Sequence, residues 1–191
     1  TKIVMKILST EQTREADAYT ITNEPILSID LMERASRTFV NWFIQKFPVQ
    51  DFEMISVICG KGNNGGDGMA SARLLQSEGY DLAVFVLDRT VKISEDFRTN
   101  LERVQQLKEL NKISLKQIVS VDELPVFGEE EIIIDAILGS GLSRPITGEL
   151  ADILNFLNEC KNTMVAVDIP TGVFSDKPTT SPCIEADYTF A

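Results

Sequence analysis

Residues 60–68 read GKGNNGGDG, a run in which five glycines accompany two asparagines and an aspartate. An apolar strand pattern at 55–59 precedes the run and a helical pattern follows it, so the run ends a strand and opens a helix. The bare N–H groups and the dipole at a helix N-terminus favour an anion. A tight turn alone would need only one or two such residues. We therefore expect the run to bind a phosphate-bearing ligand.

Two further polar segments follow predicted strands. Asp135 comes after three isoleucines and leads into the loop at 139–145, and Asp168 stands shortly before Thr171. In doubly wound sheets ligands bind outside the carboxyl ends of the strands, so these segments and the glycine-rich run can share one site. Each aspartate could instead cap a loop or turn. A buried carboxylate at Asp135 would need a partner, which Arg144 or a cation could supply.

The residue types at these strand ends also limit the chemistry. Amide, carboxylate and hydroxyl oxygens are hard donors, so Asn64, Asp135 and Thr171 would form a cation site if the three loops converge. The chain has no histidine, which excludes most catalytic zinc sites and Ser-His or Cys-His catalysis. Acid–base work must fall to other groups, and Asp168 is among the few candidates.

Composition narrows the partners and the setting. The formal net charge of -11 argues against nucleic acid or an anionic membrane as a partner. No apolar run approaches the roughly 20 residues that a membrane-spanning helix needs. The three cysteines are scattered and form no CxxC pair, which indicates a reduced, cytoplasmic protein.

The elements that must position these residues alternate along the chain. We expect a helix opening at Ser9 and further helices at 28–47, 66–78, 94–110 and 148–160. We expect strands at 55–59, 82–87, 117–119, 131–138, 164–167 and 186–191. Continuous apolar strands between amphipathic helices predict an α/β fold whose parallel sheet is covered on both faces. The apolar stripe of 28–47 is typical of core or subunit interface. We expect a single domain over 1–191, truncated at its C-terminus because the chain stops inside a strand.

Three stretches occur in the order GKGNNGGDGMASARLL, DAILGSGLSRPITGEL and VAVDIPTG, after the lead-in stretches LSTEQTREADAYTI and LMERAS. Together they resemble the YjeF N-terminal domain family, the NAD(P)H-hydrate epimerases, over most of the chain. The resemblance implies a Rossmann-like three-layer αβα sandwich with a mostly parallel sheet and N-terminal helices, commonly as a homodimer. It implies interconversion of the R and S forms of hydrated NADH or NADPH (NAD(P)HX) in cofactor repair. An ATP- or ADP-dependent NAD(P)HX dehydratase, fused in many bacteria, would be the partner.

The resemblance also implies roles for individual residues. Substrate contacts would come from Asn63, Asn64, Gly65, Gly66, Asp67, Gly139, Ser140, Gly141, Leu142, Ser143, Arg144, Pro145 and Asp168. Asn64, Asp135 and Thr171 would hold one potassium ion (K+) per subunit. Asp168, or Asp135 beside it, would handle a proton while the hydroxyl at C6 of the nicotinamide ring leaves and returns. Some positions differ from the family pattern: Arg34 and Ser36 stand where Asn and Gly are common, Lys61 where Pro is frequent, and Thr171 replaces Ser.

Two other functions compete with this interpretation. Relatives of the domain serve as non-catalytic dimerising scaffolds. An enzyme is favoured here by retention of Asn64, Asp67, Asp135, Asp168 and the Thr171 hydroxyl. An NAD(P)-dependent dehydrogenase would need an acidic ribose-binding residue about 20 residues beyond the glycine-rich run, where Asp88 is a loosely placed candidate. The glycine spacing does satisfy GxGxxG, although that pattern alone is weak evidence.

Overall fold

The computed structural model describes residues 8–52, 54–88, 93–110 and 112–191. Six strands form one sheet in the order β3-β2-β1-β4-β5-β6, and every neighbouring pair is parallel. The strands are β1 (Ile55–Cys59), β2 (Leu82–Leu87), β3 (Ser114–Ile118), β4 (Ile132–Ala136), β5 (Thr163–Val167) and β6 (Tyr188–Phe190). The predicted Rossmann-like parallel sheet is confirmed.

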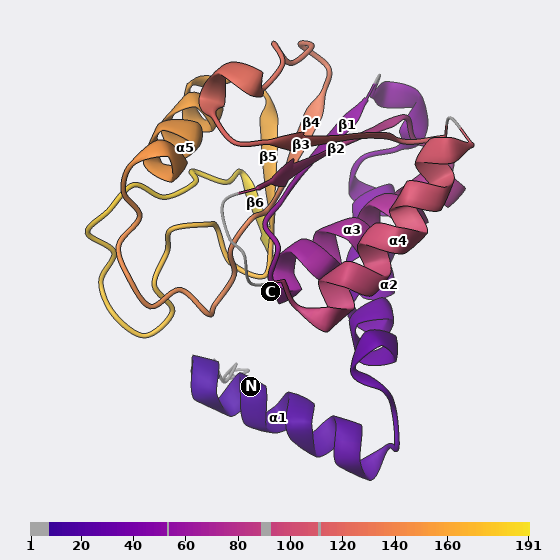
Figure 1. The fold of residues 1–191 in the computed structure, drawn as a ribbon, viewed down its shortest axis with the longest axis vertical. Helices are drawn as coiled ribbons and strands as arrows, with labels where there is room; N and C mark the ends of the chain where they lie inside the picture. The colour runs from indigo at the N-terminus through magenta and orange to yellow at the C-terminus, as the bar shows by residue number, and fades with distance from the viewer. Residues whose placement is uncertain (1–7, 53, 89–92, 111) are drawn as a thin grey trace, which may run out of the picture.

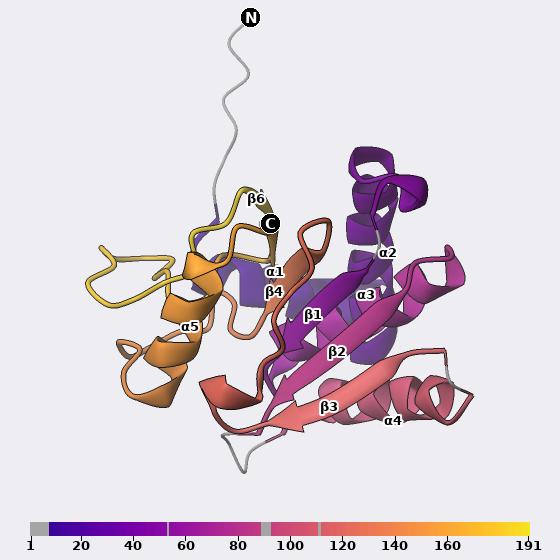
Figure 2. The same ribbon diagram turned by 90° about the horizontal axis from the view of Figure 1, so that it is seen from above.

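Helices cover both faces of the sheet. They are α1 (Thr10–Asn23), α2 (Ser28–Lys46), α3 (Asn63–Ser77), α4 (Glu95–Glu109) and α5 (Glu149–Glu159), with 3-10 turns at Val49–Asp51 and Val121–Glu123. Figure 1 shows α2, α3 and α4 stacked on one side of the sheet and α5 on the other, while α1 stands apart from these layers. Seen from above, the sheet twists from β3 at one edge to β6 at the other (Figure 2). This is the three-layer arrangement that the sequence predicts.

Alternation along the central strands builds two cores. In β1, Val57 packs into the core under α2 and α3, whereas its neighbour Ile58 packs into the core under α5. In β4, Ile134 and Ile133 divide between the same two cores. Because both faces of these strands are fully buried, their sequences are mostly apolar, with Ser56 and Asp135 as the buried polar exceptions. The apolar stripe of α2, with Phe39 and Phe43 among its buried residues, belongs to the first core.

Two element boundaries differ from the sequence prediction in ways that shape the site. Strand β4 ends at Ala136 rather than at residue 138, because Asp135 Oδ1 accepts the Ile137 N–H at 3.1 Å and turns the chain out of the sheet. Helix α3 begins at Asn63 rather than at residue 66, with Gly62 in extended conformation before it. The two asparagines therefore lie in the first turn of a helix and not in the preceding loop.

Candidate active site

Three loops meet at the carboxyl end of the sheet. They follow β1, β4 and β5, which are neighbours in the sheet, and the chain order reverses at β1. Such a switch point opens a crevice for ligand. A cavity of about 450 Å³ lies here. Its lining comprises Thr10, Thr13, Arg14, Asp17, Gly62, Asn63, Asn64, Asp67, Ile137, Leu138, Gly139, Ser140, Gly141, Leu142 and Asp168. The convergence that the three sequence segments predict is therefore present.

Asp135 and Thr171 are fully buried and bonded to each other beside this cavity. The Thr171 N–H donates to Asp135 Oδ2 at 2.7 Å, and Thr171 Oγ1 lies 2.6 Å from Asp135 Oδ1 and 3.0 Å from the Leu138 carbonyl oxygen. Thr171 Oγ1 also accepts the Leu138 N–H at 2.9 Å. A hydroxyl has one hydrogen, so it can donate to only one of the two oxygens. With the Ile137 N–H donating to Asp135 Oδ1, the junction gathers carboxylate, hydroxyl and carbonyl oxygens at one point beside the cavity.

The buried side-chain amide of Asn64 lacks a partner and so points to a ligand. It is 9% exposed, and neither its Oδ1 nor its Nδ2 has a hydrogen-bond partner among the described residues. Among the described residues, no group of three or more His, Cys, Asp or Glu side chains is placed to hold a metal. One carboxylate with amide, hydroxyl and carbonyl oxygens is instead a hard, weakly charged donor set, which fits a monovalent cation.

No ion pair in the described ranges joins Arg144 to Asp135, because Arg144 is exposed on the loop after β4. Burial raises the pKa of Asp135 to about 6, against the lowering effect of its hydrogen bonds from Thr171 and Ile137. The expectation that Arg144 could neutralise this carboxylate is wrong, and a cation remains the alternative. Asp135 does not line this cavity, nor the cavities of about 740 and 430 Å³ that share residues with it.

Asp168 faces the cavity in a constrained geometry. Its φ is 68°, the one positive φ among the described non-glycine residues, and its Oδ2 accepts the Ser140 N–H at 2.7 Å. A Cβ on Gly139 would overlap that carboxylate oxygen, so the loop after β4 needs glycine there. Left-handed backbone in a non-glycine residue costs free energy and is concentrated at functional sites. In this backbone conformation one carboxylate oxygen of Asp168 accepts the Ser140 N–H, while the side chain lines the cavity.

Asp67 shares the cavity and lies among negative charges. Burial, followed by the charges of Asp168, Asp17 and Asp96, raises the pKa of Asp67 to about 7. Burial and Asp168 also raise the pKa of Asp17. One carboxyl group in the cavity is thus partly protonated near neutral pH, while another is held by a backbone N–H. A carboxyl group with a raised pKa in a cavity is a candidate for a general acid.

The remaining predicted residues divide between packing and a second cavity. Gly65 and Gly66 are buried and line none of the cavities; a Cβ on Gly65 would overlap the Gly60 carbonyl oxygen. Ser143, Arg144 and Pro145 line a larger cavity of about 740 Å³, which also reaches the glycine-rich run. The unusual Lys61 pairs with Asp88, the acidic residue that a dehydrogenase would need for ribose.

The model of the family described as YjeF-related protein N-terminus matches residues 28–191. The chain belongs to this family. It is 34% identical over 171 residues to a Limosilactobacillus reuteri protein named NAD(P)H-hydrate epimerase, covering 90% of this chain and 76% of that protein. An Oenococcus oeni protein of the same name is also 34% identical, with 88% of this chain and 76% of that protein covered.

Two other relatives extend the comparison. A Moorella thermoacetica protein named Bifunctional NAD(P)H-hydrate repair enzyme Nnr is 33% identical over 189 residues, which are 97% of this chain and 35% of that protein. The crystal structure of the yeast protein ynu0, YNL200c, superposes with a TM-score of 0.79 at 27% identity, covering 97% of this chain and 79% of the yeast chain. The YjeF-related fold is thus shared at the level of coordinates.

Helix α1 lies outside the residues that the family model matches, yet it lines the cavity. Its cavity-lining residues are Thr10, Thr13, Arg14 and Asp17, which share one face of the helix because they are spaced three and four apart. The sequence interpretation missed them. The signal that could have found them is a predicted helix whose inward-facing side is polar, whereas a core helix has an apolar one.

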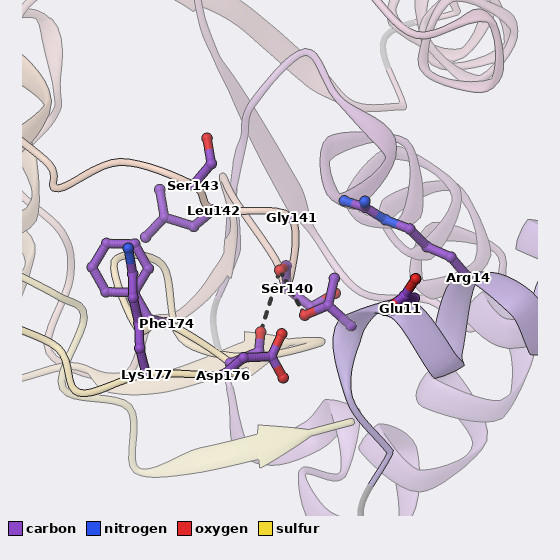
Figure 3. Close-up of a pocket in the computed structure, with 11 residues that line it drawn as sticks. Glu11, Arg14, Ser140, Gly141, Leu142, Ser143, Phe174, Asp176 and Lys177 are labelled. Atoms are coloured by element: carbon purple, nitrogen blue, oxygen red, sulfur yellow. Dashed lines mark hydrogen bonds between the residues drawn. The ribbon is translucent and has the colours of Figure 1, made fainter.

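A third cavity, of about 430 Å³, adjoins the first where α1 contacts the loop after β4. It shares Thr10, Arg14 and residues 140–142 with the first cavity and adds Phe174, Lys177 and their neighbours. Figure 3 shows Arg14 reaching from α1 toward Gly141, with Phe174 and Lys177 beyond the loop. In the described residues, no helix is long and apolar enough to span a membrane.

Proposed function

We propose that this protein is an NAD(P)H-hydrate epimerase that interconverts the R and S forms of hydrated NAD(P)H in nicotinamide cofactor repair. The observation that carries the proposal is 34% identity, over 90% of the chain, to a curated protein of that name. The site supports it, because a cavity at the sheet's switch point brings together Asn63, Asp67 and Asp168. A nucleotide is therefore the substrate, and the enzyme is an isomerase.

We assign the proton chemistry to carboxyl groups that line the cavity. The reaction must break the C6–O bond on one face of the ring and remake it on the other. The departing hydroxyl must gain a proton, and the water that adds to the ring must lose one. Asp67, with its raised pKa, suits the donor. Asp168, whose Oδ2 is held on the Ser140 N–H, suits the acceptor. The lone pair of the ring nitrogen stabilises the cation between the two steps. Because Asp135 is enclosed by Thr171 and Ile137, we keep this role for Asp168 rather than Asp135.

We propose that Asn64, Asp135 and Thr171 hold the K+ ion. The support is the unpartnered buried Asn64 amide and the cluster of carboxylate, hydroxyl and carbonyl oxygens around Thr171. A bound cation would supply positive charge beside a nucleotide in an otherwise acidic protein. The N-terminal end of α3 presents Asn63 and Asp67 to the cavity, and the loop after β4 presents backbone groups.

The repair role implies a second enzyme. Epimerisation supplies the S form, so an ATP- or ADP-dependent dehydratase must consume it, and the Moorella relative is named as bifunctional. We retain the homodimer and the cytoplasmic setting as predictions. The latter is supported by three cysteines that are all unpaired.

A coupled assay tests the function. The R form of hydrated NADH is incubated with an S-specific dehydratase, ATP and KCl, and recovery of NADH is followed by its absorbance. We expect this protein to accelerate recovery well above the spontaneous rate. Asp168→Asn should lower the rate by about 10²- to 10⁴-fold, the usual contribution of a positioned acid or base. Unaccelerated consumption of the R form would reject the epimerase and leave the scaffold alternative. Full activity of Asp168→Asn would reject only the residue assignment.

A further inference from the structure

Helix α1 is held by the site rather than by the core. None of its residues is buried, and its stripe toward the protein is polar. A hydrogen bond joins the Thr10 hydroxyl to the Ser140 carbonyl oxygen at 3.2 Å, in the loop after β4. A helix that buries no apolar face gains little from packing, so its residues at the cavity have another use.

Arg14 occupies the place where two cavities meet. It lines both the cavity of about 450 Å³ beside Asp168 and the cavity of about 430 Å³ beside Phe174. Its Nη2 lies 3.6 Å from the position that a Cβ on Gly141 would occupy, so the guanidinium stands over the glycine-containing loop. None of the ion pairs within the described ranges involves Arg14, although Glu11 and Asp17 lie one turn away on the same helix.

The charge of the first cavity creates a demand that Arg14 can meet. Asp17, Asp67 and Asp168 line it, and Arg14 is the one Lys or Arg side chain among the described residues that do so. A dinucleotide carries two negative charges on its pyrophosphate, which those carboxylates repel at close range. Guanidinium groups bind phosphate oxygens through paired N–H donors. A cation at the shared border of two cavities is also where a molecule of two linked halves would place its linker.

We propose that Arg14 is a substrate-binding residue and that its guanidinium binds the pyrophosphate of the hydrated dinucleotide at the junction of the two cavities. This places the reacting ring in the cavity beside Asp168 and extends the other nucleoside toward Phe174. The inference rests on the proposed function for the identity of the substrate. Helix α1 is then a wall of the active site, contributed by a segment outside the core of the fold.

The test compares Arg14→Gln, Arg14→Lys and the matched control Arg37→Gln, which removes an exposed arginine on α2 paired only to Glu33. With Arg14→Gln we expect KM to rise on the order of 10- to 100-fold, the loss of a hydrogen bond between charged groups, with kcat changed less than about threefold. Arg14→Lys should recover part of the loss because it keeps the charge. Arg37→Gln should match the wild type.

A binding measurement separates this inference from the proposed function. ADP-ribose carries the pyrophosphate but lacks the nicotinamide ring, so its Kd by calorimetry does not depend on turnover. Arg14→Gln should weaken ADP-ribose binding by a similar factor and flatten its dependence on salt, with an unchanged circular dichroism spectrum. Equal Kd and KM for Arg14→Gln and wild type would overturn the inference even in an active epimerase. Weakened ADP-ribose binding in a protein without epimerase activity would support the phosphate contact while rejecting the proposed function.

Discussion

The carboxyl group of Asp67 lies in a cavity with other negative charges, and this predicts a stability that depends on pH. Its pKa is raised from 3.8 to about 7, mainly by burial and then by Asp168. The folded state therefore binds this proton more tightly than the unfolded chain does. The resulting stabilisation is present below pH 3.8 and is lost as the pH rises through about 7.

Asp67→Asn should remove this loss. We expect the free energy of unfolding at pH 8 to rise by roughly 2–4 kcal/mol relative to wild type, with little change at pH 4. Urea unfolding at both pH values measures the difference, with the exposed Asp81→Asn as the control substitution. Epimerase activity should fall in the same variant, since active sites trade stability for function. An equal effect of Asp67→Asn at pH 4 and pH 8 would contradict the raised pKa.

At the residue level, the positions of residues along the chain predict much of the site. Asp168 and Asn64 stand at strand ends or helix starts, where parallel sheets bind ligands, and both line the cavity. The sequence could not reveal the raised pKa of Asp67, because that depends on burial and then on Asp168 and Asp17, and Asp17 is 50 residues away and reaches the cavity through α1. The sequence also could not show that Arg144 is exposed and forms no ion pair with Asp135.

At the level of elements, the start of α3 depends on one close backbone approach. Gly65 lies in the first turn, where a Cβ would overlap the carbonyl oxygen of Gly60. Gly62 precedes the helix with no heavy atom within 4 Å of its would-be Cβ and with a φ of -90°. The two glycines of one run therefore have different roles, close packing for Gly65 and an open position for Gly62.

Gly65→Ala should displace the first turn of α3 from the loop that follows β1. We expect a loss of more than about 3 kcal/mol in the free energy of unfolding and a large loss of epimerase activity. Gly62→Ala is the matched control and should stay within about 0.5 kcal/mol of wild type. Denaturant unfolding of the pair measures both. Similar stabilities for the two variants would show that the run tolerates a side chain at Gly65.

The same glycines explain why the sequence prediction began this helix late. Glycine and asparagine are poor helix formers, so propensity favours a start at residue 66. In the structure Gly66 N–H donates to the Gly62 carbonyl oxygen at 3.0 Å, and the helix begins at Asn63. The tertiary approach of Gly65 to Gly60 overrides propensity. Strong apolar runs such as β1 and β2, by contrast, have the bounds that their hydrophobicity predicts.

At the scale of the whole molecule, the strand order produces the site. Continuous apolar strands predict a parallel sheet with helices on both faces, but they do not predict which strands are neighbours. The order β3-β2-β1-β4-β5-β6 places β1 beside β4 and β4 beside β5, so segments more than 100 residues apart meet. Asn64 follows β1, Asp135 is the penultimate residue of β4 and Thr171 follows β5. A cation bound by all three would therefore join three loops of the fold and should affect global stability.

This reasoning predicts that K+ stabilises the folded protein in the absence of substrate. A ligand that binds only the native state at ten times its Kd adds about 1.4 kcal/mol, which for a domain of this size raises Tm by roughly 3–6 °C. We expect that rise in KCl relative to tetramethylammonium chloride of equal ionic strength, because the larger cation cannot enter a buried oxygen cluster. Thr171→Val keeps the side-chain shape but removes the hydroxyl, so it should unfold at the same temperature in both salts. Thr38→Val, which removes an exposed hydroxyl bonded to the Arg34 carbonyl oxygen on α2, should retain the full difference. A Tm that is equal in the two salts for the wild-type protein would reject the cation, whereas the unpartnered Asn64 amide and the oxygen cluster at Thr171 lead us to expect the difference.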